Sequence, residues 1–320
     1  MRRLVFIGLF LTLSACKTDA PSPASTQAQG PVEVSLQLNW VPEPEFGGIY
    51  AAREQGFFAA EGLAVNIIKG SPGVPSGQLT ASGKTTFGVV GGDQLVTMRA
   101  QGAPLVAVYT SFQTFPRGIV VHEGSPHKDL EGLWKSQTKV AVEPGLPFVK
   151  WLNHRYGGQG LQLVPSSGGL ATFMGDPTMA QAVFIFAEPV ELKRRKLPVR
   201  TFKVADSGYD PYTVVVATSE DYAKQNPDVV AKLNRALRKG WSAYNADPGP
   251  TNAVMAKLNT AMSLESMHLA AQLQRPYIGA DDATLGTMTT ARWDTLIDQL
   301  RTVGAISKPV SGADCYVAAP

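Results

Sequence analysis

The chain has 320 residues, of which 44% are hydrophobic and 17% are charged, values ordinary for a soluble globular protein. Lysine and arginine number 29 against 26 aspartates and glutamates, and a balance of only +3 excludes the strongly basic character typical of nucleic-acid-binding proteins. At about 100–200 residues per domain, the length predicts two domains.

The first fifteen residues predict an export signal. Two arginines follow Met1, and the apolar run from Leu4 to Leu13 is shorter than the roughly 20 residues of a membrane-spanning helix. The run ends in "LSAC", which resembles the lipobox of bacterial lipoproteins, where the signal is cut before the cysteine and the thiol is lipidated. We therefore expect residues 1–15 to be removed and Cys16 to carry a lipid anchor. The alternative is an ordinary signal followed by a chance cysteine.

Residues 16–30 predict a flexible tether. The stretch "KTDAPSPASTQAQG" has no large apolar residue and cannot bury enough surface to fold. With Cys16 lipidated, only Cys315 remains, which excludes an internal disulfide and a four-cysteine metal site. The sequence assigns no role to Cys315.

Strands and helices alternate from residue 32 to residue 112. The strands are expected from alternating or continuous apolar runs, and the helices from longer segments with glycine near their ends. Asp93 is expected to cap the helix that begins there, and Gly102 to end it. The expected strands are 32–40, 63–70, 85–92 and 104–112, and the expected helices are 47–57, 75–84 and 93–102.

The same alternation begins again near residue 115, and a nearly all-helical segment follows Ser219. This order predicts two α/β units, each with a mostly parallel sheet, and a helical tail. The expected strands are 118–123, 139–145, 161–169, 199–206 and 212–219, and the expected helices are 147–157, 226–247, 249–262, 264–274 and 289–304.

Two similar units in one chain predict a crevice between them. In open α/β sheets, ligands bind beyond the carboxyl ends of the strands. Trp40, Gly91, Gly92, Gly145 and the segment 166–169 all lie at the carboxyl ends of expected strands. Glycines at such positions let backbone amides approach a ligand closely.

Three segments resemble substrate-binding proteins of ABC importers: "LNWVPEPEFGGIYAAREQGFFAAEGLAVNI", "FGVVGGDQLVTMRAQGAPLVAVYTSF" and "VVVATSEDYAKQNPDVVAKLNRAL". They look most like the branch that binds pyrimidine precursors of thiamine, which also includes a fungal pyrimidine synthase. Sulfonate, taurine and nitrate binders are near relatives. The resemblance covers nearly all of residues 31–310 and is more specific for the superfamily than for the ligand.

The resemblance implies the α/β, two-lobed type II periplasmic binding protein fold, with a hinge and a cleft between the lobes. Residues 31–115 and 219–320 would form lobe I and residues 116–218 lobe II, with hinges near Phe112–Gly118 and Tyr212–Ser219. It also implies a small-molecule ligand, an ABC permease and its ATPase as partners, and the periplasmic or extracytoplasmic face of a bacterial membrane. We expect a monomer with no cofactor, metal or nucleic-acid partner.

Two residues match ligand contacts of the pyrimidine binders. Trp40 matches a tryptophan that stacks on the heterocycle, and Glu188 falls where a glutamate accepts hydrogen bonds from the amino group of the ring. The alternatives are a core tryptophan for Trp40, and a helix-start residue or an ion pair for Glu188. Where the family often has a histidine, this chain has Phe46, which weakens the expectation of the same pyrimidine and argues more strongly against an enzyme.

Other polar residues at strand ends are candidate ligand contacts. Asn39, Asp93 and Gln94 could offer polar groups, although Asp93 could be only a helix cap.

The turn of Ser166, Ser167 and Gly168 could present hydroxyls and amides to an anion, or be an ordinary turn. Tyr209 and Tyr212 lie at the expected second hinge and could edge the pocket. The basic run 191–200 is expected to be a solvated helix face, with permease docking or contact with anionic lipid as the alternative.

The enzyme signatures that the sequence suggests all fail. "GQLTASGKT" has Gln78 where a phosphate-binding loop needs glycine. "HEGSPH" has the wrong spacing for a zinc site, and its glycine and proline forbid the helix that such a site needs. The chain also lacks GxSxG and a GxGxxG after a strand. We therefore assign no catalytic residue.

Three functions follow from these patterns. The first is capture of a small heteroaromatic, pyrimidine-like ligand by lobe closure. The second is binding of a small anion such as a sulfonate, taurine or nitrate, which a carboxylate in the pocket would oppose. The third is an enzyme of pyrimidine synthesis, which an export signal opposes.

Overall fold

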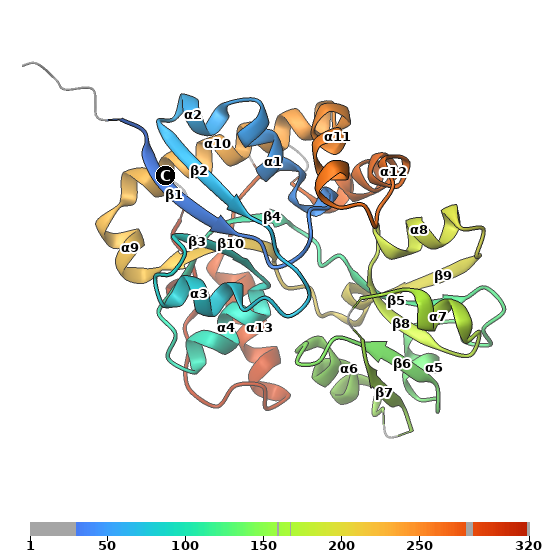
Figure 1. The fold of residues 1–320 in the computed structure, drawn as a ribbon. Coiled ribbons are helices and arrows are strands. Elements are labelled where there is room, and N and C mark those ends of the chain that lie inside the picture. The colour runs from blue at the N-terminus through green and yellow to red at the C-terminus, as the bar shows by residue number, and fades with distance from the viewer. Residues whose placement is uncertain (1–29, 159, 167, 280–283, 319–320) are drawn as a thin grey trace, which may run out of the picture. The chain divides into compact units, whose positions relative to one another are not determined.

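Two five-stranded sheets with helices on their faces make up the described part of the chain (Figure 1). The computed structural model describes residues 30–158, 160–166, 168–279 and 284–318. The expected signal 1–15, the lipid-bearing Cys16 and the tether up to residue 29 lie outside the described residues. Within the described ranges, no helix combines the length and the apolar character that crossing a bilayer requires.

The first sheet combines strands from both ends of the chain. Its order is β2-β1-β3-β10-β4, in which β1 is parallel to β2 and β3, and β10 is antiparallel to β3 and β4. Strands β3 and β4 are buried along their whole lengths, as their continuous apolar sequences predict. The strands are β1 (Val32–Gln37), β2 (Leu63–Ile68), β3 (Phe87–Val90), β4 (Leu105–Phe112) and β10 (Thr213–Ser219).

The second sheet is built from the middle of the chain and repeats the pattern of the first. Its order is β7-β6-β8-β5-β9, in which β6 is parallel to β7 and β8, and β5 is antiparallel to β8 and β9. Both sheets are therefore mixed. In each sheet only the fourth strand runs antiparallel to the other strands, so the expectation of mostly parallel sheets is corrected at that strand alone. The strands are β5 (Arg117–His122), β6 (Lys139–Val142), β7 (Gln162–Pro165), β8 (Ala180–Phe184) and β9 (Val199–Lys203).

The fourth strand of each sheet is the one that arrives directly from the other sheet. The chain leaves β4 through residues 113–116 to enter β5, and it leaves β9 through residues 204–212 to enter β10. Because β10 pairs with β3 and β4, strand pairing places the second boundary before Thr213, and not at the expected 218/219.

Helices cover both faces of the first sheet (Figure 1). Alternation along β10 explains the two cores, because Val214 and Val216 pack on one face while Val215 and Ala217 pack on the other. Helices α1 (Gly47–Glu54), α2 (Phe57–Ala60), α10 (Pro227–Ala246), α11 (Gly249–Leu258) and α12 (Leu264–Gln274) contribute to the first core, and α4 (Gly92–Ala100) and α13 (Thr290–Thr302) to the second. Helix α9 (Glu220–Gln225) adds Ala223 to the first core, and Ala81 of α3 (Ser76–Ala81) packs against the second.

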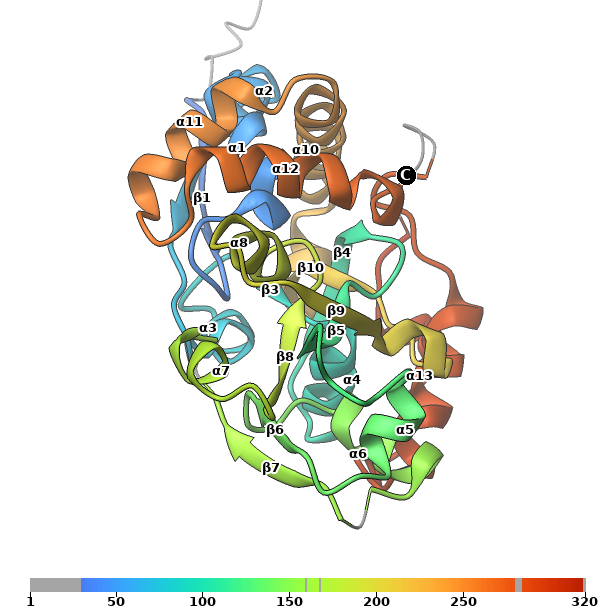
Figure 2. The same ribbon diagram turned by 90° about the vertical axis from the view of Figure 1, so that its right-hand side faces the viewer.

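Helices also cover both faces of the second sheet (Figure 2). On one face lie α5 (Leu130–Trp134) and α6 (Phe148–Tyr156), whose apolar residues join the second core. On the other face, Phe173 of α7 (Ala171–Gly175) and Leu192 of α8 (Glu188–Arg194) pack against Val120 and Val183 of the sheet.

Close packing of α1 on α10 explains the glycine pair at the start of α1. A Cβ atom on Gly47 would lie 2.2 Å from the ring of Tyr244, and one on Gly48 would lie 2.2 Å from the ring of Trp241. Any larger residue would therefore push the two helices apart. This packing positions α1 against the first core, on which Trp40 of the preceding segment also packs.

Two expected elements differ from those observed. The helix expected at 47–57 ends at Glu54, and Gly56, with φ of +75°, separates it from α2. The cap of α4 is Gly91, and Asp93 is the second residue of the helix, in its first turn, which corrects its expected role as the cap. Gly102, with φ of +97°, follows the end of α4 as expected.

Candidate ligand-binding site

A cavity of about 680 Å³ lies between the two sheets, and we call it the central cavity. Segments that follow the carboxyl ends of β1, β3, β6, β7 and β8 form its wall, as the rule for open α/β sheets predicts. Its polar, charged and aromatic lining residues include Asn39, Trp40, Glu43, Glu45, Asp93, Gln94, Phe115, Arg117, Glu143, Ser166, Phe184 and Glu188.

Trp40 lines the central cavity from the loop after β1. Strand β1 ends at Gln37, three residues earlier than expected, so the indole stands beyond the strand and is only partly buried. The backbone of Gly168, from the other sheet, lies against this ring, since a Cβ on Gly168 would come within 2.9 Å of the Trp40 Cζ2 and Cη2 atoms. Trp40 is therefore a flat apolar surface that residues of both sheets surround.

Glu188 lines the same cavity from the opposite sheet. It is the first residue of α8, and its Oε2 accepts a hydrogen bond of 2.8 Å from the Phe184 backbone N–H. The structure thus combines the two alternatives expected for this residue, because Glu188 starts a helix and also faces the cavity. Burial raises the pKa of Glu188 to about 7, although the Phe184 hydrogen bond and Arg117 oppose the rise.

Asn39, Asp93 and Gln94 also line the central cavity. The Oδ1 atom of Asn39 is buried and has no hydrogen-bond partner among the described residues. Asp93 accepts hydrogen bonds from the Gln94 backbone N–H at 2.8 Å and from the Tyr209 hydroxyl at 3.0 Å. Burial raises the pKa of Asp93, and these hydrogen bonds oppose that rise.

The serine-glycine turn contributes less to the cavity than expected. Ser166 lines it, but its hydroxyl accepts a hydrogen bond of 3.1 Å from the Gly168 N–H and so closes a local turn. Gly168 acts through its contact with Trp40. Ser167 lies outside the described residues.

Tyr209 and Tyr212 are packed behind the cavity, which corrects their expected place at its edge. Both are buried, and neither is among the described residues that line it. Tyr209 touches the site indirectly, through its hydroxyl on Asp93. The Tyr212 hydroxyl accepts a hydrogen bond from the Thr289 backbone N–H at 3.0 Å, and the guanidinium of Arg292 covers its ring.

Four charged residues that the sequence analysis missed line the central cavity: Glu43, Glu45, Arg117 and Glu143. Glu143 directly follows β6, so the strand-end rule that selected Gly145 could have found it. Glu43 and Glu45 flank Pro44 in the loop after Trp40, where two acids without nearby lysine or arginine were a signal. Arg117 begins β5 and gives no comparable signal.

The carboxyl groups of the cavity raise one another's proton affinity. Burial, together with the charge of Glu188, raises the pKa of Glu43 to about 8, and hydrogen bonds from Asn259 and Trp40 partly oppose this. The pKa of Glu45 lies well above its usual value because of burial and the neighbouring charge of Glu43. Among the described lining residues, Arg117 is the one cationic side chain, and it pairs with Glu143 at 3.5 Å. The other carboxyl groups of the cavity therefore have no cationic partner among these residues.

The basic run after Glu188 lies away from the cavity. Its residues 193–196 are exposed, as a solvated helix face predicts, and none of them is among the described cavity-lining residues. Glu191 is the exception, because it is buried, pairs with Arg194 and Arg195, and accepts a hydrogen bond of 2.9 Å from the Ser266 hydroxyl of α12.

No histidine is among the described residues that line the cavity. Across the described ranges, no group of three or more histidine, cysteine, aspartate and glutamate side chains could hold a metal ion.

Comparison with known protein families places this architecture. The family model described as NMT1/THI5 like matches residues 43–250. The chain belongs to the NMT1/THI5-like family. This confirms the resemblance to the thiamine-pyrimidine branch of binding proteins. The matched range includes Glu43, Glu45 and Glu188.

The relatives of this NMT1/THI5-like chain include both binding proteins and enzymes. It is 23% identical to riboflavin-binding protein RibY of Chloroflexus aurantiacus over 96% of this chain and 94% of the relative. It is 25% identical to the formylaminopyrimidine-binding protein of Halalkalibacterium halodurans over 99% and 98% of the two chains. It is also 26% identical to a 4-amino-5-hydroxymethyl-2-methylpyrimidine phosphate synthase of Uromyces fabae over 72% of each.

Solved structures confirm the fold. The periplasmic aliphatic sulphonate binding protein SsuA of Escherichia coli superimposes with a TM-score of 0.68 at 17% identity, covering 89% of this chain and 97% of that one. The chain therefore has the two-lobed type II periplasmic binding protein fold.

Proposed function

We propose that the protein is the extracytoplasmic solute-binding component of an ABC importer and that it captures a small heteroaromatic ligand of the pyrimidine type. The observation that carries this proposal is that Trp40 and Glu188, which come from different sheets, line one cavity at the carboxyl ends of the strands. A flat ring would stack on the indole and donate hydrogen bonds from an amino group to the carboxylate.

Closure of two lobes would complete the site. One lobe consists of the first sheet and its helices, from residues 31–112 and 213 onward, and the other consists of the second sheet and its helices. A ligand that contacts Trp40 and Glu188 together favours the closed arrangement, because it gains both contacts only there. The closed form would then be the one that a permease and its ATPase recognise, while the lipid on Cys16 holds the protein, as a monomer, at the membrane.

Binding of a small anion is the less favourable alternative, although the sulphonate binder SsuA shares the fold. Five carboxyl groups and one guanidinium are among the described residues of the cavity wall. Arg117, the one cationic side chain among these described residues, already pairs with Glu143, so an anion would find no free positive charge in this wall. The acidic wall therefore favours a ligand that donates hydrogen bonds.

Catalysis of pyrimidine synthesis is also less favourable, although one relative is named as a synthase. The residue at the position where the family often has histidine, Phe46, is fully buried, and it is not among the described lining residues. The cavity wall that the structure describes thus offers carboxyls, amides and an indole, which suit binding. We therefore infer that no bond is broken.

Calorimetric titration of the purified full-length protein with 4-amino-5-hydroxymethyl-2-methylpyrimidine tests this function. We expect saturable binding, and Trp40→Ala should weaken it by about fivefold to 150-fold, because stacking of a base on an aromatic ring contributes about 1–3 kcal/mol. Phe57→Ala removes a half-buried ring outside the cavity and serves as the matched control. Binding of taurine or nitrate in place of the pyrimidine, or unchanged affinity in Trp40→Ala with a native circular dichroism spectrum, would contradict the proposal.

A further inference from the structure

The charge of the central cavity is not balanced within the described part of the protein. Five carboxyl groups line it, on Glu43, Glu45, Asp93, Glu143 and Glu188, against the single guanidinium of Arg117. Arg117 pairs with Glu143 at 3.5 Å, and its guanidinium also lies over the Phe184 ring. The other four carboxyls form no ion pair with any described residue, so a bound cation would be the partner that lets them ionise.

Three of these four acids have hydrogen-bond donors from the protein. Glu43 accepts a bond of 3.3 Å from the Asn259 side-chain amide, and Glu188 accepts one of 2.8 Å from the Phe184 N–H. Asp93 accepts bonds from Gln94 and Tyr209. These donors hold the carboxyl groups in place, but all of them are neutral.

Glu45 has no such donor. Only 7% of its surface is exposed, it lines the central cavity, and its carboxyl group accepts no hydrogen bond from the residues that the structure describes. A carboxyl group in this position is costly unless a partner pairs with it. Asn39 Oδ1, buried at the same cavity, is a second acceptor without a described partner. A ligand that donates hydrogen bonds would satisfy both the Glu45 carboxyl group and Asn39 Oδ1.

The acids also lie close enough to act on one ligand together. The charges of Glu43, Glu188 and Glu143 all raise the proton affinity of Glu45, and the charge of Glu188 does the same for Glu43. Trp40 stands in the same wall and offers the face of an indole, on which cations bind favourably.

We propose that the ligand is a cation, namely a flat nitrogen heterocycle that carries a positive charge on the ring or on a short amine substituent. Its ring lies on Trp40, and its charged donor faces Glu45, with Glu43 and Glu188 beside it. This inference rests on the proposed binding function and adds the charge of the ligand to it.

Two pairs of matched compounds test the charge. In the first, 4-amino-5-aminomethyl-2-methylpyrimidine carries an ammonium group where 4-amino-5-hydroxymethyl-2-methylpyrimidine has a neutral hydroxyl. In the second, 1-methylnicotinamide carries a ring charge that nicotinamide lacks. Titration calorimetry with the full-length protein near neutral pH should find the cation of a pair at least about tenfold tighter, as charge-assisted hydrogen bonds predict.

The outcomes separate this inference from the function on which it rests. If the neutral pyrimidine binds as tightly as the charged one, the ligand charge is wrong and the pyrimidine function stands. If 1-methylnicotinamide binds tightly and neither pyrimidine does, the cation preference stands and the pyrimidine function falls. If none of the four compounds binds, both are overturned.

Variants of the cavity glutamates show which carboxyl group produces the preference for a cation over a neutral compound. Glu45→Gln should reduce the ratio of cation to neutral affinity by at least about fivefold, because glutamine keeps the shape but cannot ionise to pair with the cation. Glu188→Gln provides the same test if Glu45→Gln does not fold. Glu33→Gln, an exposed glutamate of β1 outside the cavity wall, is the control that should leave the ratio unchanged. A ratio that stays the same in both cavity variants would overturn the proposal.

Discussion

At the scale of single residues, the contact between Gly168 and Trp40 joins the two halves of the site. Gly168 has φ of +84°, a conformation that other residues adopt only with strain, and its missing side chain leaves room for the indole. Gly168 follows β7 of one sheet and Trp40 follows β1 of the other. The contact between Gly168 and the indole therefore forms only when the two sheets are arranged as they are in this structure.

We therefore expect Gly168→Ala to weaken ligand binding by at least about fivefold and to lower the free energy of unfolding by about 1 kcal/mol. A Cβ at this position would meet the Trp40 ring at 2.9 Å and displace it. Gly169→Ala is the matched control, since a Cβ there meets no atom within 4 Å and the backbone has no positive φ. Equal ligand affinities of the two variants in calorimetry would rule out this role for Gly168.

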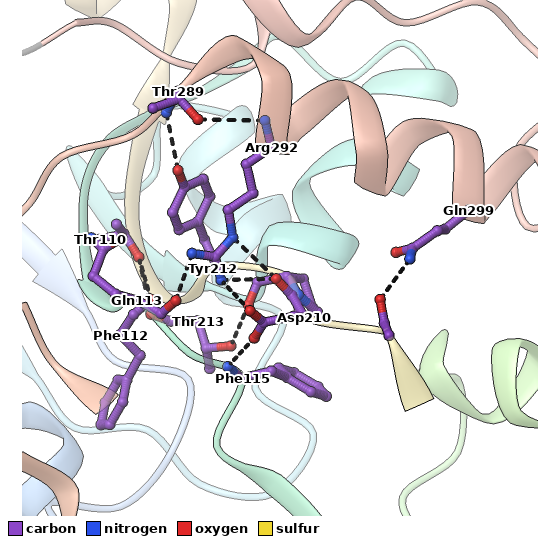
Figure 3. Close-up of polar contacts among 12 residues, drawn as sticks. Thr110, Phe112, Gln113, Phe115, Asp210, Tyr212, Thr213, Thr289, Arg292 and Gln299 are labelled. Carbon is purple, nitrogen blue, oxygen red and sulfur yellow. Dashed lines mark hydrogen bonds and ion pairs between the residues drawn. The ribbon is translucent and has the colours of Figure 1, made fainter. Parts of the chain in front are cut away.

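At the scale of elements, Arg292 of α13 ties together the two segments that connect the sheets (Figure 3). Its guanidinium donates to the Gln113 carbonyl in the first connection at 2.5 Å and to the Asp210 carbonyl in the second at 2.8 Å. Asp210 in turn accepts a bond from the Phe115 N–H at 2.5 Å. Next to this network, Val214 has φ of +52°, a strained value for a β-branched residue.

Arg292→Gln should lower the free energy of unfolding by about 1.5–3 kcal/mol, the usual range for hydrogen bonds to a charged group. The glutamine is too short to reach both connections. Arg301→Gln, on the same helix, removes only an exposed pair with Asp298 and should cost less than about 1 kcal/mol. Urea denaturation of both variants measures the difference, and similar midpoints would show that Arg292 does not hold the connections.

At the scale of the whole molecule, the acidic cavity should make stability depend on pH. The folded-state pKa values of Glu43, about 8, and of Glu188, about 7, lie above the ordinary 4.5 of an unfolded chain. At pH values between 4.5 and about 8, the folded protein therefore binds more protons than the unfolded one. The resulting stabilisation is complete below the unfolded pKa and is lost as the pH rises through the folded one.

We expect the ligand-free protein to lose at least about 1.4 kcal/mol of unfolding free energy between pH 5 and pH 8, the equivalent of one pKa unit. Glu43→Gln should flatten this dependence, and Glu33→Gln should leave it as in the wild type. Chemical denaturation across this pH range measures the slope. A stability that rises with pH over the range would mean that the cavity carboxyls are already ionised in the folded protein.

The sequence by itself determined the alternation of strands and helices, the family, and the rule that strand ends face a ligand. That rule selected Asn39, Trp40, Asp93, Gln94 and Ser166, and the family resemblance selected Glu188; all six line the central cavity. It succeeds because hydrophobic periodicity and strand direction are local properties of the chain.

Only the tertiary structure decided how these residues combine. The hydrogen bond from Tyr209 to Asp93 joins residues 116 positions apart and moves the tyrosine behind the cavity, where the sequence had placed it at the edge. The pairing of β10 with β3 and β4 moves a boundary that apolar patterning could not locate. The acid excess of the cavity depends on distances between Glu43, Glu45 and Glu188, and such distances exist only after long-range packing brings the two sheets together, because electrostatic interactions depend on separation in space and burial.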